Sequence, residues 1–125
     1  MKNISKLNYD EVRSHFNDRE ILELTAQQLV KDLSLIGEEI DFDALQTNAY
    51  INLYNKLKQL IVQFIETDIQ SLMNMLYRID IGEKAAKSAL LKESGDKVDL
   101  LAQHILKREL QKVLLKKEFE KMNFE

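Results

Sequence analysis

The stretch from Thr47 to Ile79 constrains the fold most, because neither glycine nor proline interrupts it. Its first part has apolar residues at the spacing of one α-helical face: Tyr50, Leu53, Leu57, Leu60, Ile61 and Phe64. After Phe64 the apolar residues cover more of the circumference, so we expect packing from several sides, by other helices or by a second subunit. One helix of this length would be a rod of roughly 50 Å. We therefore expect either a kink near its middle or a rod that spans a bundle or a dimer.

The remaining sequence predicts four more helices, over residues 9–16, 18–36, 83–93 and 97–121. Asn8 with Glu11, and Asp43 with Gln46, have the spacing of capping boxes. Gly37 is placed to end the second helix in a left-handed conformation. The sequence contains no proline and only three glycines, which favours long helices over hairpins.

Together these patterns predict one all-α domain over residues 1–125. It should be an irregular bundle of about five helices around a long central helix at about 47–79. We expect residues 1–7 and 119–125 to fray.

Two carboxylates, Asp68 and Glu109, interrupt apolar helix faces and are the candidate polar residues of the core. A carboxylate among apolar side chains is costly unless it is paired or hydrated. They could act as acid–base residues or ligands in a bundle core. The favoured interpretation is that Asp68 lies on the flank of its helix, bonded to a lysine, an arginine or water. Glu109 should pair with Arg78, Arg108 or a lysine, or lie where the apolar face drifts, and whether the two carboxylates meet is left open.

The patterns that carry catalysis or metal binding are missing from the sequence. It has no cysteine, and neither of its two histidines belongs to the Glu-x-x-His motif of carboxylate-bridged metal centres. It also lacks a glycine-rich phosphate loop and a G-x-S-x-G motif. We therefore predict no catalytic residue, no metal ligand, no cofactor and no small-molecule ligand.

Charge is unevenly distributed along the chain. Acidic residues predominate between Asp10 and Asp43, and basic residues predominate between His104 and Lys121. Acidic and basic helices that lie side by side, in an antiparallel arrangement or in a self-complementary dimer, would explain this. The basic bias of the last helix is weak for a nucleic-acid footprint.

Apolar residues beyond the core faces suggest an interaction surface. The candidates are Leu24 and Leu35 on the far face of the second helix, and Ile69, Leu72, Met73 and Leu76 on the wide part of the central one.

The function that follows is a non-enzymatic protein that forms a homodimer or binds a protein partner. No segment is apolar enough to span a membrane or to act as a secretory signal, so we expect a cytoplasmic location. One alternative is a nucleic-acid-binding or regulatory module that uses the basic C-terminal helix. A second is an enzyme with carboxylate acid–base residues in the bundle core.

Overall fold

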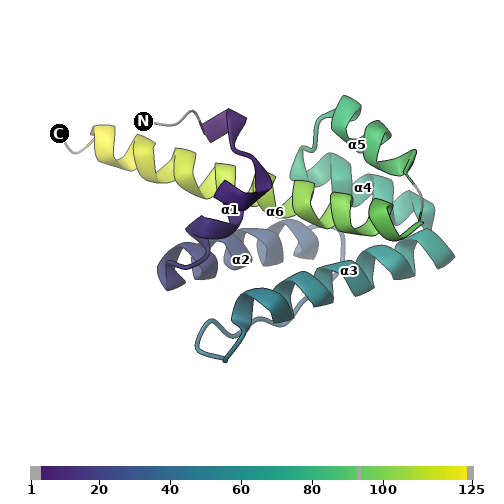
Figure 1. Ribbon diagram of the computed structural model, residues 1–125, viewed down its shortest axis with the longest axis horizontal. Helices are drawn as coiled ribbons and strands as arrows, with labels where there is room; N and C mark the ends of the chain where they lie inside the picture. The colour runs from purple at the N-terminus through teal and green to yellow at the C-terminus, as the bar shows by residue number, and fades with distance from the viewer. Residues whose placement is uncertain (1–3, 93, 124–125) are drawn as a thin grey trace.

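The computed structural model describes residues 4–92 and 94–123, whose regular secondary structure is helical and includes no strand. The elements in this part are η1 (Ile4–Lys6), α1 (Tyr9–His15), α2 (Arg19–Ser34), α3 (Ala49–Thr67), α4 (Ile69–Ile79), α5 (Glu83–Leu90) and α6 (Ser94–Asn123) (Figure 1). Buried side chains from all six α-helices join in a continuous apolar core. The predicted all-α bundle is therefore confirmed.

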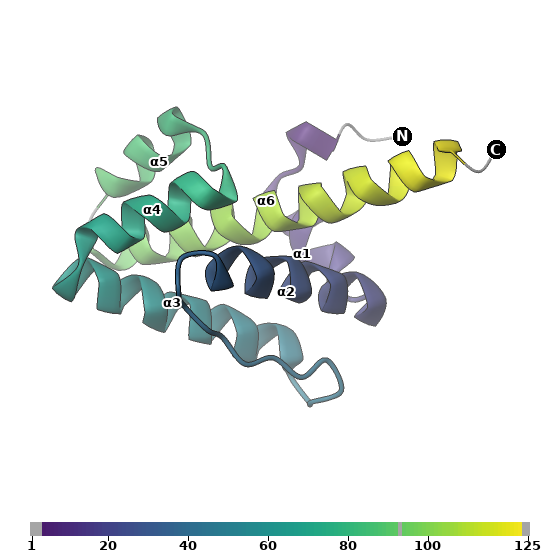
Figure 2. The same cartoon turned by 180° about the vertical axis from the view of Figure 1, so that it is seen from behind.

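The helix at the centre of the bundle is α6, not the stretch at 47–79. It is 30 residues long and contacts η1 and each of the helices α1 to α5. Leu101, Ile105, Leu106 and Leu110 have no exposed surface, as expected for a helix packed on several sides. Figures 1 and 2 show that the C-terminal end of α6 projects beyond the N-terminal end of α2.

The expected central helix is divided at Asp68 into α3 and α4, so the kinked alternative holds and the single rod does not. The backbone at Asp68 leaves the helical region, with φ −161° and ψ 77°. Its side chain accepts hydrogen bonds from the Ser71 backbone N–H at 3.1 Å and from the Ser71 hydroxyl at 2.6 Å. The bond from the Ser71 N–H satisfies a backbone donor that the first turn of a new helix leaves free, so it favours a break at Asp68. Asp68 is exposed, so it is not a polar residue of the core. This agrees with the favoured interpretation that it lies outside the apolar face, although the partner that the structure gives it is Ser71.

The predicted helix ends agree with the structure at two sites. Asn8 and Glu11 form a capping box, in which Asn8 Oδ1 accepts from the Glu11 N–H at 2.9 Å and Glu11 Oε1 accepts from the Asn8 N–H at 3.3 Å. Gly37 has φ 82°, the left-handed conformation that a glycine adopts without strain. The Glu38 N–H then reaches back to the Leu33 carbonyl at 2.9 Å and closes the end of α2.

The predicted capping box at Asp43 is wrong. Asp43 Oδ1 accepts from the Leu45 N–H at 2.9 Å, and the chain turns there without starting a helix. The helix α3 begins at Ala49, after Asn48 with φ 60° and no side-chain cap. The Asp43 side chain bonds the backbone N–H two residues later and so stabilises a turn. This bond replaces the capping-box bond, to the N–H three residues later, that would start a helix.

The chain ends that were expected to fray are only partly described. Leu7 is buried, and the carbonyl of Ile4 accepts a hydrogen bond of 3.1 Å from the Gln111 side chain of α6. Residues 119–123 continue α6. Residues 1–3 and 124–125 lie outside the described part of the chain.

Candidate functional site

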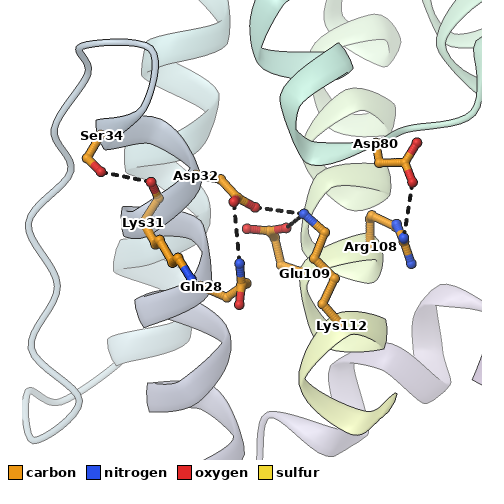
Figure 3. A network of polar contacts seen from close by, with 8 residues as sticks. All are labelled: Gln28, Lys31, Asp32, Ser34, Asp80, Arg108, Glu109 and Lys112. Carbon is orange, nitrogen blue, oxygen red and sulfur yellow. Dashed lines mark hydrogen bonds and ion pairs between the residues drawn. The ribbon is translucent and has the colours of Figure 1, made fainter. Parts of the chain in front are cut away.

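The buried polar cluster of the protein lies where α2 packs against α6. Lys112 Nζ is 2.7 Å from Asp32 Oδ2 and 2.9 Å from Glu109 Oε1, and Gln28 Nε2 donates to Asp32 Oδ1 at 3.3 Å (Figure 3). Glu109 is 0% exposed, and Asp32 is also buried. Figure 3 shows the carboxyl groups of Asp32 and Glu109 pointing toward each other across the seam between the helices.

Helical spacing brings these side chains together. Gln28 and Asp32 are four residues apart on α2, and Glu109 and Lys112 are three apart on α6, so each pair shares one helix face. A second ion pair, Lys117 to Glu20 at 3.0 Å, joins the end of α6 to the start of α2. The two ion pairs follow one another in opposite directions along α6 and α2, so the two helices are antiparallel. This agrees with the charge asymmetry of the sequence.

Glu109 is in an environment that disfavours its charged form. Within the described part of the chain, neither of its carboxyl oxygens receives a hydrogen bond, because the contact with Lys112 lacks suitable geometry. Burial, followed by the interaction with Asp32, raises the pKa of Glu109 to about 8, although Lys112 acts in the opposite direction. Burial also opposes ionisation of Asp32, but its interactions with Glu109 and Lys112 outweigh burial and lower the pKa of Asp32. Burial and the neighbouring carboxyl therefore favour the protonated form of Glu109, while Lys112 favours the charged form of Asp32.

The two carboxylates that the sequence singled out do not form an acid–base pair. Asp68 caps α4 at the surface, where its hydrogen bonds with Ser71 lower its pKa. Glu109 is sealed between α2 and α6, so a substrate cannot reach it in this conformation. Its carboxyl partner is Asp32, which the sequence analysis did not identify. Among the described residues, no group of three or more histidine, aspartate or glutamate side chains could hold a metal ion.

One aligned set of exposed apolar side chains is on α4, and we call it the α4 stripe: Ile69, Met73 and Tyr77. These side chains follow one another at four-residue intervals and are 54%, 41% and 88% exposed. Beside them, Gln70 and Asn74 are joined by a side-chain hydrogen bond of 3.0 Å. The helix contains no acidic residue. Tyr77 was missed by the sequence analysis, although its spacing from Met73 could have identified it.

The other candidate interface residues lie elsewhere. Leu72 and Leu76 are buried against the rest of this chain, which corrects their assignment to an exposed interface. Leu24 lines a groove of about 390 Å³ between α2 and α6, together with Val113. Leu35 is exposed at the C-terminal end of α2.

Several basic side chains of α6 already bind carboxylates of the same chain. Arg108 pairs with Asp80 at 3.2 Å, in addition to the pairs that Lys112 and Lys117 make with α2. These cations are engaged within the fold, which reduces the charge that α6 could offer to phosphate groups.

Within the ranges 4–92 and 94–123, the structure contains no helix long and apolar enough to cross a membrane. The sequence matches no protein-family model, and the chain has no significant match among the curated proteins or the solved structures.

Proposed function

We propose that this protein is a non-enzymatic helical protein that forms a homodimer through the α4 stripe. The observation that supports the proposal is the alignment of three large, exposed apolar side chains on one face of a helix without acidic residues. Single exposed apolar residues are normal, but an aligned set is typical of a surface that another molecule covers. A cytoplasmic location stays part of this proposal.

The arrangement of the α4 stripe fits a second copy of the same chain. Met73 is midway between Ile69 and Tyr77, so two antiparallel α4 helices related by a two-fold axis would place Met73 against its own copy. Ile69 of each chain would then pack against Tyr77 of the other. The adjoining Gln70 and Asn74 are uncharged, so self-pairing would not bring like charges together.

Light-scattering mass after size exclusion, measured over a range of protein concentrations, tests the proposal. We expect the wild-type chain to approach twice its monomer mass of 14.6 kDa. Met73→Glu should give the monomer mass, because two glutamates would face each other at the two-fold axis. The matched control is Leu45→Glu, at a leucine that is 78% exposed in the connection before α3, and it should keep the dimer.

A wild-type mass of 14.6 kDa at every concentration would contradict self-association. A dimer that survives Met73→Glu would place the interface on another surface.

A further inference from the structure

The cluster between α2 and α6 contains one more acidic group than basic groups. Among the described residues, Asp32 and Glu109 face one cation, Lys112, whose side chain is 21% exposed. If both carboxyl groups were ionised, a net negative charge would be buried beside leucine and isoleucine side chains. Glu109 would carry much of this negative charge, although no group in the described part of the chain donates a hydrogen bond to its carboxyl oxygens.

We propose that Asp32 and Glu109 form a proton-binding site that controls the seam between α2 and α6. The seam is closed while the pair shares one proton, which Glu109 donates to Asp32. It opens when this proton is lost to solvent. The proposal does not depend on self-association through α4.

The charged groups that face Glu109 are few. Asp32 comes from α2 and Lys112 from α6, while the neighbouring Arg108 is turned to Asp80. The helices α1, α3, α4 and α5 and the segment η1 also pack against α6. Some of their ionisable side chains bind one another or Asp99: Tyr9 with Tyr50, Tyr54 and Lys58 with Asp99, and Lys87 with Glu83. The others are exposed, partly exposed or used in a cap: Lys6, Asp10, Glu11, Arg13, His15, Lys56, Glu66, Tyr77, Arg78 and Lys84. The proton is therefore the group that balances the charge of the cluster.

Loss of the proton leaves two buried carboxylates facing each other. Each ionised carboxylate requires several hydrogen-bond donors, and Lys112 alone cannot supply them for both. Glu109 has no exposed surface, so water reaches it when α2 and α6 move apart at this level. Gln28 bonds Asp32 and also lines the groove that contains Leu24 and Val113, so an opening at the pair would widen that groove.

The absence of cysteine from the sequence allows a direct test of this movement. Gln27 and Lys116 are exposed residues on opposite sides of the groove. Spin labels on a Gln27→Cys, Lys116→Cys chain would report the distance between α2 and α6 by pulsed electron resonance at pH 6 and pH 9.5. We expect one short distance at pH 6 and a shift of part of the population to longer distances at pH 9.5.

The same labels on a Glu109→Gln background should give the short distance at both pH values, because a glutamine amide cannot ionise and can still donate to Asp32. Glu118→Gln, at an exposed glutamate of α6, is the matched control and should keep the pH response. An unchanged distance distribution in the chain with Glu109, or the same response in Glu109→Gln, would overturn the proposal. Carbon-13 NMR of the Glu109 carboxyl in the unsubstituted chain provides an independent measurement: titration above pH 7 is expected, and titration in the ordinary glutamate range would also overturn it.

Discussion

Lys112 of α6 donates a hydrogen bond of 2.7 Å to Asp32 of α2, and the contact lies inside the seam that the two helices bury together. A buried ion pair adds little stability by itself, since desolvation of both charges offsets their attraction. Removal of one partner is costly, however, because the other charge remains buried. Lys117 and Glu20 join the same two helices at the surface and offer a comparison.

We expect Lys112→Met to lower the free energy of unfolding by about 3 kcal/mol at pH 7, because Asp32 would lose the one cation that it pairs with among the described residues. Lys117→Met removes a cation of similar shape from an exposed pair and should cost no more than about 1 kcal/mol. Urea unfolding followed by circular dichroism measures both values. Equal losses for the two variants would show that the cluster at Asp32 is not energetically distinct from a surface pair.

Leu72 belongs to the buried face of α4, and Ile69 belongs to the exposed α4 stripe. Leu72 has no exposed surface, so Leu72→Ala should cost about 2–5 kcal/mol of unfolding free energy through lost burial and the cavity that remains. Ile69→Ala should change the stability of the monomer by no more than about 0.5 kcal/mol, because its side chain is largely exposed. Measurements at low protein concentration keep association out of the comparison. A small loss for Leu72→Ala would contradict its place in the core.

Asp68 should stabilise α4 as its N-cap. We expect Asp68→Ala to lower the urea midpoint at pH 7, and Asp68→Ser to retain most of the stability because a serine hydroxyl can also cap. The pKa of Asp68 is below its ordinary value of 3.8, so its contribution is present above that value and is lost as the pH falls further. The difference between wild type and Asp68→Ala should therefore shrink in acid. A difference that does not change with pH would mean that the charged cap is not its source.

Local patterns in the sequence predicted local features of the fold. The capping box of Asn8 and Glu11 and the helix end at Gly37 depend on residues a few positions apart, so sequence spacing identifies both. The break at Asp68 was only one of two expected outcomes, because its cap competes with continuation of a strongly apolar helix. The turn at Asp43 was mistaken for a helix start because the same side chain can bond its backbone in either conformation.

Features that depend on long-range contacts could not be predicted. The intrusion of Glu109 on an apolar face was visible in the sequence, but its partner Asp32 is on a helix far away along the chain. The width of the apolar surface after Phe64 indicated packing from several sides. It did not indicate that Leu72 and Leu76 are covered by this chain while Ile69 and Met73 remain exposed.

The claim that Asp32 and Glu109 share a proton in the folded protein is tested most directly by urea unfolding. The wild-type chain and Glu109→Gln are compared from pH 4.5 to 9. Since the pKa of Glu109 rises from 4.5 to about 8 on folding, the stability that protonation provides is full below pH 4.5 and is lost as the pH rises through 8. The advantage of Glu109→Gln over wild type should therefore grow across this window, by on the order of 4 kcal/mol as an upper limit. A difference between the two proteins that stays constant from pH 4.5 to 9 would contradict a protonated Glu109 in the folded protein.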